Sequence, residues 1–133
     1  MTVEARDRVR WSDVDIMGVM RFDRYLRFAE AAETEFFRSA GFTYEQLARE
    51  HGVWFARVRL EVDYRAAARM DDIVVTRAVL TQIGGSSLRF RFPMHKEEDG
   101  SALAEAVLVI AAVDTATLRP ARLPGPLRDA LQP

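Results

Sequence analysis

The sequence predicts an α+β protein in which one long helix packs against an antiparallel β-sheet of about five strands. Residues 23–40 repeat their apolar side chains at three- and four-residue steps, which is the pattern of an amphipathic helix. One stretch before this helix and four after it alternate in polarity or are rich in β-branched residues, which is typical of strands. A single long helix combined with a run of strands predicts a helix lying on one face of a sheet.

The composition limits the class of protein. With 133 residues, of which 49% are hydrophobic, the chain suits one globular domain over residues 1–133. Its 19 basic and 20 acidic residues are balanced, so we expect no nucleic-acid partner. The absence of cysteine excludes disulfides, thiolate catalysis and cysteine-based zinc sites, and it fits a cytoplasmic protein. The charged N-terminus is unlike a signal peptide, and no apolar run reaches about 18 residues, so we expect no membrane span.

The first elements follow from local patterns. A strand is expected between Val3 and Trp11, where apolar and charged residues alternate and Asp7 alone interrupts the apolar set. The long helix comes next, and Gly41 is suited to ending it because glycine readily adopts the left-handed conformation. A short second helix is then expected, with Thr43 as its cap and a glutamine three residues further on, which is the capping-box spacing.

The rest of the chain is expected to form the sheet. Residues 54–66 alternate most clearly, and one face of this strand would carry Trp54, Ala56, Val58, Leu60, Val62 and Tyr64. Further strands are expected at residues 73–83, 88–95 and 103–113, with turns at 69–72, 84–87 and 97–100. The almost continuous apolar run at 103–113 predicts a central strand covered on both faces. Regular structure is expected to end at residues 120–127, PARLPGPL.

This order of elements, a strand, a long helix, a short helix and four strands, is the order of a hot-dog fold. Small residues at Ala29, Ala31 and Ala32 would let a curved sheet wrap closely around the helix. Such a sheet leaves an edge strand open, and proteins usually pair or cover open edges. A homodimer is the simplest way to do so.

Two aspartates in WSDVDIMG, residues 11–18, are the leading candidates for chemistry. Asp13 and Asp15 point the same way if this segment is extended. Either or both could satisfy backbone N–H groups in the turn before the helix. Alternatively, a carboxylate near a helix N-terminus could act on a carbonyl or on water in a partly dry pocket, and Gly18 would let the backbone pass close to a substrate. We expect no metal site, because neither histidine is near in sequence.

The other polar candidates favour structural roles. His51 lies at the end of the short helix and His95 on the polar side of a strand, so surface positions are expected for both. Glu30 and Glu33 lie on the long helix, where solvated charge is the default, although a glutamate buried under a dimer partner could be a base. The GGSS stretch at 84–87 lacks the context of a phosphate loop and is expected to form a hairpin turn.

The order of elements and several stretches resemble one known family. These stretches are DVDIMGVM, RYLRFAEAAETEF, VRLEVDYRAAARMDDIVV, GGSSLRF and AEAVLVIAAVDTATLRPARLP, which together cover about residues 8–131. They resemble the hot-dog acyl-CoA thioesterases of the 4-hydroxybenzoyl-CoA thioesterase type. The resemblance is closest to the bacterial group encoded beside the Tol–Pal envelope proteins.

The resemblance implies roles for particular residues. Asp15 matches the catalytic carboxylate of the family and would act as nucleophile or as general base. The backbone N–H at about Phe22 would bind the thioester carbonyl, and Gly18, Val19 and Tyr25 would line the substrate site. Asp13 would hold the loop. The resemblance also implies an acyl-CoA substrate, no cofactor, and a homodimer or homotetramer with each site between two subunits.

Three departures from the family pattern bear on the substrate. Position 22 is phenylalanine, where relatives often carry histidine or asparagine, and Glu33 stands where arginine is common. Residues 83–85, IGG, lack the basic residues that some relatives use for the phosphates of coenzyme A. Those phosphates would then depend on Arg57, Arg59 or Arg65. Two alternatives stay open, which are a thioesterase for carrier-protein-bound acyl groups and a non-catalytic acyl-binding dimer.

Overall fold

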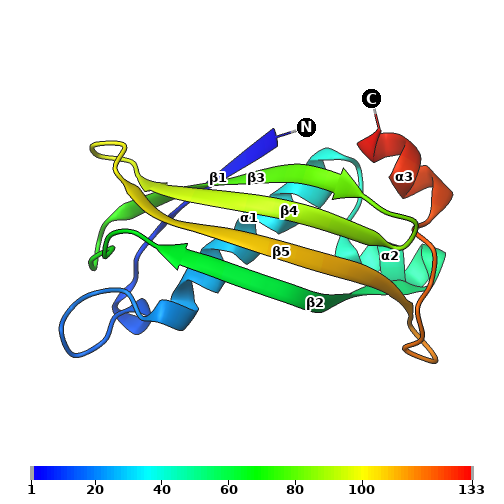
Figure 1. Cartoon of the computed structure of the whole chain (residues 1–133), viewed down its shortest axis with the longest axis horizontal. Helices are drawn as coiled ribbons and strands as arrows, with labels where there is room; N and C mark the ends of the chain where they lie inside the picture. The colour runs from blue at the N-terminus through cyan, green and yellow to red at the C-terminus, as the bar shows by residue number, and fades with distance from the viewer. Residues whose placement is uncertain (1, 133) are drawn as a thin grey trace.

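The computed structural model describes residues 2–132; residues 1 and 133, the ends of the predicted domain, lie outside the described residues. The strands form one antiparallel five-stranded sheet in the order β1-β3-β4-β5-β2. The long helix α1 lies behind this sheet in Figure 1. The elements are β1 (Thr2–Arg8), η1 (Trp11–Asp13), η2 (Phe22–Arg24), α1 (Tyr25–Ser39), α2 (Tyr44–His51), β2 (Val53–Tyr64), β3 (Ile73–Ile83), β4 (Ser87–Lys96), β5 (Ala102–Asp114) and α3 (Gly125–Leu131).

The core lies between α1 and the sheet, as the amphipathic pattern predicts. Ala32 and Phe36 are fully buried on the sheet-facing side of α1. Phe36 meets Phe90 of β4 edge to face, with ring centroids 5.0 Å apart. The methyl side chain of Ala32 lets the sheet approach the helix, and the aromatic pair fills the space beyond it. The predicted α+β hot-dog fold, with five strands around one long helix, is confirmed.

The predicted helix ends and the hairpin turn are also confirmed. The side chain of Thr43 accepts a hydrogen bond from the N–H of Gln46 at 3.1 Å, and this capping box starts α2. Gly41, after the end of α1, has a φ of 92°, in the left-handed region that favours glycine. Between β3 and β4, the N–H of Gly84 donates to the carbonyl of Ser87 at 2.7 Å, which closes the turn.

The predicted single apolar face of β2 is wrong, because a β-bulge divides the strand. Arg57 pairs with Ile110 of β5 and Arg59 pairs with Val109, so Val58 is an extra residue. An extra residue exchanges the two faces of the strand from that point on. The faces therefore change at Val58, and the six apolar residues predicted for one face are split between the two.

The faces of β2 can be followed from its contacts. Before the bulge, Phe55 faces the helix and stacks on Phe37 of α1, with ring centroids 5.5 Å apart. After the bulge, Leu60 is paired with Leu108 and lines a cavity against α1. Trp54, Leu60 and Tyr64 keep exposed fractions of 47%, 44% and 49%, so much of the apolar surface of β2 is uncovered within one subunit.

Two other features differ from expectation. The first strand ends at Arg8 rather than continuing to Trp11, which lies exposed in η1. The central strand β5 alternates between buried and half-buried residues instead of being buried on both faces. The sheet face turned toward the viewer in Figure 1 carries no helix in the described part of the chain, which explains this alternation.

The chain also continues into a helix where regular structure was expected to end. Helix α3 follows Pro124, has a proline in its first turn, and buries Leu127 and Leu131. Proline is tolerated in a first helical turn because the N–H that it lacks would have no partner there. None of the helices within residues 2–132 is both long and apolar enough to cross a bilayer.

Candidate active site

Asp15 lies in a tight loop between β1 and α1, which projects at the lower left of Figure 1. Its N–H donates to the carbonyl of Val19 at 3.0 Å, and its own carbonyl accepts from Gly18 at 3.0 Å. Gly18 has a φ of 77°, which the turn requires and which only glycine adopts at no cost. The half-buried Asp15 carboxylate accepts the N–H of Met17 at 2.8 Å through Oδ1. No donor within residues 2–132 bonds its Oδ2, so this oxygen is available to a substrate or a water molecule.

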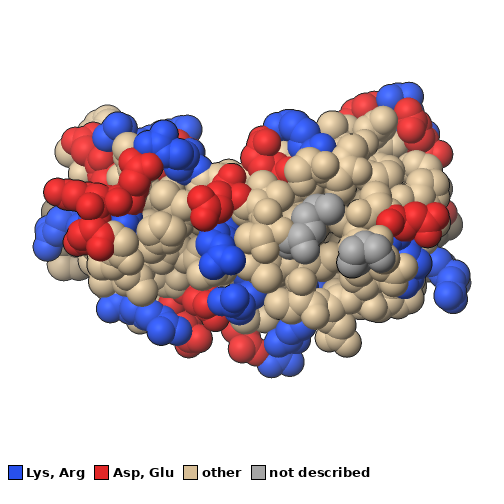
Figure 2. Space-filling model, turned by 90° about the horizontal axis from the view of Figure 1, so that it is seen from above, with Lys and Arg blue, Asp and Glu red and all other residues tan. Residues whose placement is uncertain are grey.

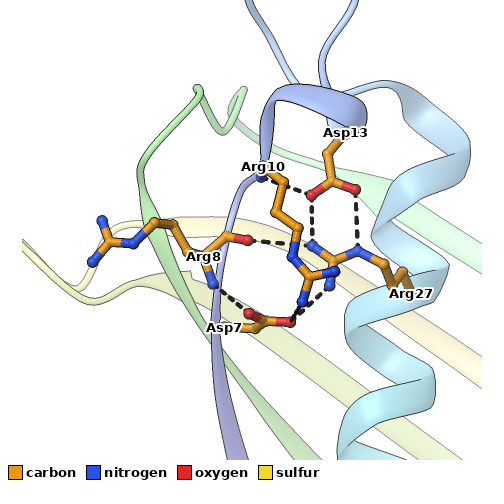
Figure 3. Close-up of polar contacts among 5 residues, drawn as sticks. All are labelled: Asp7, Arg8, Arg10, Asp13 and Arg27. Carbon is orange, nitrogen blue, oxygen red and sulfur yellow. Dashed lines mark hydrogen bonds and ion pairs between the residues drawn. The ribbon is translucent and has the colours of Figure 1, made fainter.

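Asp13 has a different environment from Asp15, although only Val14 separates them in sequence. It is buried, with 1% of its surface exposed, and it accepts two hydrogen bonds from Arg27 of α1, at 3.1 Å from Nε and 2.5 Å from Nη2 (Figure 3). The N–H of Arg10 donates to the same carboxylate at 2.8 Å. These contacts fix the start of the loop against the helix.

The network extends to Asp7, which accepts from Arg27 Nη1 at 2.7 Å (Figure 3). Burial alone would raise the pKa of Asp13, but the hydrogen bonds from Arg27 and Arg10 and the charge of Arg27 outweigh it and hold the pKa below its usual value. The pKa of Asp7 is lowered in the same way, since the bonds from Arg27 and the Arg8 N–H outweigh its burial. Both carboxylates are therefore ionised structural groups, and Asp13 holds the loop as the family resemblance implies.

The end of the loop places Phe22 at the start of η2, directly before α1. Phe22 is 74% exposed, and its carbonyl accepts a hydrogen bond from the hydroxyl of Tyr64 at 2.7 Å. The first N–H groups of a helix have no acceptor within it. No residue among 2–132 accepts the N–H of Phe22, so this donor is available where the helix dipole favours negative charge.

Tyr25, the first residue of α1, anchors this helix start. It is buried, meets Tyr64 edge to face at 5.1 Å between ring centroids, and its hydroxyl donates to the carbonyl of Ala66 at 3.4 Å. Val19 pairs with Arg69 in an isolated bridge, so the returning arm of the loop lies against the segment after β2. The structure thus places Gly18 and Val19 in the loop of Asp15 and Tyr25 at the start of the helix that follows it, and their contact with a substrate stays a prediction.

Exposed apolar side chains surround this loop. Ile16, Met17 and Phe22 have exposed fractions of 102%, 74% and 74%. A cluster of exposed apolar residues beside a carboxylate indicates a surface that a substrate or a second subunit covers.

An apolar cavity of about 220 Å³ begins near the same end of α1 and runs between this helix and the sheet. We call it the α1 cavity; its lining residues are Leu26, Ala29, Glu30, Glu33, Arg57, Leu60, Phe92, Ala106 and Leu108. Leu26 lies in the first turn of α1, four positions after Phe22, whose free N–H could bind a substrate oxygen. The cavity is therefore placed to receive the acyl part of a substrate whose carbonyl lies at the helix start.

Glu33 is the most deeply buried carboxylate among residues 2–132, with 0% of its surface exposed. It accepts hydrogen bonds from both terminal nitrogens of Arg57, at 2.5 and 2.9 Å, and from the hydroxyl of Tyr44. Burial raises the pKa of Glu33 above its ordinary value, and the bonds and charge of Arg57 only partly offset this effect. Glu30, in contrast, is exposed.

This ion pair was not predicted from the sequence, although the spacing of Glu33 along the helix indicated its burial. Glu33 follows Ala29, Ala32 and precedes Phe36 on the apolar stripe, at helical spacings that place it on the buried face. Arg57 is the matching signal on β2, because it shares a face with Phe55.

The three arginines predicted for the phosphates of coenzyme A are not brought into one cluster. Arg57 is engaged with Glu33 on the helix side, and the bulge turns Arg59 to the other face, where it pairs with Glu61. Arg65 lines a separate surface hollow of about 310 Å³ together with His95. The face shown in Figure 2 has basic and acidic residues interspersed, without an extended basic patch. Within residues 2–132, no three side chains of the metal-binding types lie close enough to hold an ion together.

Together, the long helix on a five-stranded sheet and the loop carboxylate at the helix start define a hot-dog protein of the thioesterase class. The chain belongs to the Thioesterase-like superfamily, whose profile matches residues 9–131. It is 30% identical over 123 residues to the acyl-CoA thioesterase YbgC of Haemophilus influenzae, covering 92% of this chain and 89% of that protein. It is 32% identical over 117 residues to the acyl-CoA thioester hydrolase YbgC of Escherichia coli O6:H1, covering 88% of this chain and 86% of that protein.

Solved structures share this fold. A hypothetical protein from Thermus thermophilus is 32% identical, with a TM-score of 0.89 over 97% of this chain and 96% of its own. The 1,4-dihydroxy-2-naphthoyl-CoA thioesterase from Synechocystis also has a TM-score of 0.89, over 98% of this chain and 95% of its own, and at 20% identity it shows a shared fold alone. The predicted family and the predicted class of enzyme, a thioester hydrolase, are confirmed.

Proposed function

We propose that this protein hydrolyses the thioester of an acyl-CoA to the free acid and coenzyme A, with Asp15 as its reacting carboxylate. The observation that carries the proposal is the free Oδ2 of Asp15 in the loop that leads to the free N–H of Phe22. The proteins named YbgC in Haemophilus influenzae and Escherichia coli, described as acyl-CoA thioesterases, support the choice of substrate.

The chemistry divides between the two groups. The thioester carbonyl oxygen accepts the N–H of Phe22, which stabilises the negative charge that develops on this oxygen. As nucleophile, Asp15 attacks the carbonyl carbon, the C–S bond breaks, and coenzyme A leaves as thiolate; water then hydrolyses the acyl-aspartate anhydride. As general base, Asp15 instead takes a proton from water while the water oxygen attacks. Hydrolysis over several turnovers in ¹⁸O-water tests the nucleophilic route, because label enters Asp15 only when water attacks the aspartyl carbonyl of the acyl-aspartate anhydride.

The remaining contacts are assigned from their positions. Gly18 and Val19 would line the site with their backbone, and Tyr25 would support the helix start. Arg59 and Arg65 are the candidates for the phosphates of coenzyme A, because the guanidinium of Arg57 is already bonded to Glu33. The hollow lined by Arg65 and His95 favours Arg65 of the two.

We further propose a homodimer or homotetramer in which each acyl site lies between two subunits. The exposed apolar side chains of β2, which is an edge strand, and of the Asp15 loop support this assembly. A cytoplasmic location suits a chain without cysteine.

The test is hydrolysis of a panel of acyl-CoAs of varied chain length and ring content, with Asp15→Asn as the control. We expect turnover by the parent protein and its loss in the variant. An Asp15→Asn variant that hydrolyses acyl-CoA at the parent rate would refute the role of Asp15.

A carrier-protein-bound acyl thioester is the second candidate substrate. It is favoured by the residues IGG at 83–85 and by the separation of the three arginines, which leave no obvious phosphate cluster. Turnover of acyl-carrier substrates without turnover of free acyl-CoA would support it. Ligand binding without hydrolysis of either substrate would instead indicate a non-catalytic acyl-binding dimer.

A further inference from the structure

Two cavities lie in line along β2 and share one residue. The α1 cavity extends from Leu26 to Glu33 and Arg57. A second cavity of about 160 Å³, which we call the α2 cavity, is lined by Tyr44, Leu47, Val53, Trp54, Phe55 and Arg57. Arg57 lines both cavities, Glu33 lines the first, and Tyr44 lines the second. The hydrogen-bonded cluster of these three side chains therefore stands between the two spaces.

We propose that the Glu33–Arg57–Tyr44 cluster is the stop that limits the length of the acyl group. This inference rests on the proposed function, because it takes the α1 cavity as the acyl site. Leu26 and Glu33 are seven positions apart on α1, which corresponds to about 10 Å along the helix axis. An acyl chain that enters the cavity at Leu26 thus meets the cluster after about 10 Å.

The chemistry of the cluster makes it a fixed wall. Glu33 is fully buried, and three donors engage its carboxylate. An apolar chain that displaced Arg57 would leave this buried carboxylate without its main partner, and such unpaired burial is strongly unfavourable. The side chains before the wall, including Leu60, Phe92 and Leu108, are apolar, so they favour a hydrocarbon chain that ends short of it.

The experiment removes two side chains of the cluster and measures which acyl-chain lengths the enzyme prefers. Glu33→Ala combined with Arg57→Ala removes both charges together, so neither is left buried alone. We expect the two cavities to join and the kcat/KM ratio of palmitoyl-CoA to octanoyl-CoA to rise by about tenfold or more, since a single methylene in an apolar pocket is worth about tenfold or more in discrimination.

A matched variant separates the effect of the added space from the effect of removing the two charges. Glu33→Gln combined with Arg57→Met removes the ion pair but keeps side chains of similar length, so it should retain the parent ratio. The proposal is overturned if the double-alanine protein keeps the parent ratio, or if both double variants change it equally. Should the double-alanine protein fail to fold, Glu33→Gln with Arg57→Ala keeps the helix side filled and opens the strand side, with the same expectation.

Binding gives a readout that does not depend on turnover. Non-hydrolysable acyl-CoA thioethers of increasing chain length are titrated into the parent and the double-alanine protein by calorimetry. We expect parent affinity to fall for chains beyond the wall, and this fall to be lost in the variant. An affinity independent of chain length in the parent overturns the length stop, whereas absence of acyl-CoA hydrolysis by the parent counts against the proposed function instead.

Discussion

At the scale of single residues, two aspartates separated by one residue have opposite environments. Asp13 is buried and held by Arg27, whereas Asp15 is half-buried and keeps Oδ2 free of donors within residues 2–132. A buried, fully bonded carboxylate is suited to structure, and an accessible one beside a helix N-terminus is suited to reaction. The two residues should therefore respond differently to the same substitution.

Asp15→Asn is expected to lower kcat by at least about a hundredfold, because an amide is neither an effective nucleophile nor a base at neutral pH. Its stability should stay near that of the parent, since an asparagine oxygen can still accept the N–H of Met17. Steady-state kinetics and thermal melting measure the two effects. A parallel fall in activity and melting temperature would show that Asp15 is structural.

Asp13→Asn should show the reverse, with a loss of stability as its main effect. The substitution removes the charge that faces Arg27, and breaking such a buried pair costs about 3 kcal/mol. The side chain of Arg27 is 25% exposed, so water recovers part of this loss. Urea denaturation measures the change in the free energy of unfolding. A destabilisation smaller than that of an exposed-pair variant such as Glu45→Gln would contradict the structural role.

The same network predicts a pH dependence of stability. The pKa values of Asp7 and Asp13 are lowered in the folded protein, so the unfolded chain takes up these protons first as the pH falls. Their contribution to stability is present above the unfolded pKa of about 4 and is lost as the pH falls through the folded values. Urea denaturation between neutral pH and pH of about 3 should show this loss in the parent and a smaller slope in Asp13→Asn. Equal slopes would exclude the network as its source.

At the scale of elements, the sequence predicts whatever depends on local spacing. The α1 helix, its glycine stop at Gly41 and the Thr43 cap follow from periodicity and from residue conformation, and the structure has them as expected. The bulge at Val58 was not predictable in this way, because apolar and polar residues keep alternating through it and only pairing with β5 reveals the extra residue. The Glu33–Arg57 pair joins positions 24 apart in sequence, so local spacing could not reveal it.

Deleting Val58 tests the bulge. Without it, Arg57 and Leu60 become two positions apart and both still face α1, because their partners Ile110 and Leu108 are also two positions apart in β5. We therefore expect the Glu33–Arg57 pair to be kept and the loss of unfolding free energy to stay within about 1 kcal/mol. Val58→Ala keeps the backbone and alters a half-exposed side chain, so its effect should stay within about 0.5 kcal/mol. A loss of about 3 kcal/mol or more on deletion, measured in urea, would show instead that the bulge itself is needed to keep Glu33 paired.

Helix α3 was missed because prolines and a glycine at 120–127 suggested a loop. Its anchor is Leu127, which is fully buried, and Arg128 donates to the carbonyl of Gly84 in the β3–β4 turn. Leu127→Ala should therefore cost about 2–5 kcal/mol of unfolding free energy. Asp129→Ala, at an exposed position of the same helix, is the control and should be nearly neutral. A neutral Leu127→Ala would mean that α3 contributes no stability.

At the scale of the whole molecule, one subunit leaves apolar surface that its own chain does not cover. The outer face of the sheet has no helix over it in the described part of the chain (Figure 1), and β2 is an edge strand with exposed Trp54 and Val58. The same strand carries Tyr64, which bonds the helix start beside Asp15. An assembly through this edge would thus cover apolar surface and support the site at once.

Val58→Lys tests whether assembly and activity depend on this edge. A lysine on an edge strand opposes strand pairing, because its charge would have to be buried between subunits. By light scattering we expect the parent to have two or four times the 15.1 kDa mass of one chain and the variant to shift toward a single chain, with a corresponding loss of hydrolysis. Leu118→Lys places the same charge at an exposed turn after β5 and should keep the parent mass and activity. A parent that hydrolyses acyl-CoA as a single chain would show that the active site is complete within one subunit, and the exposed surface of β2 would then need another explanation.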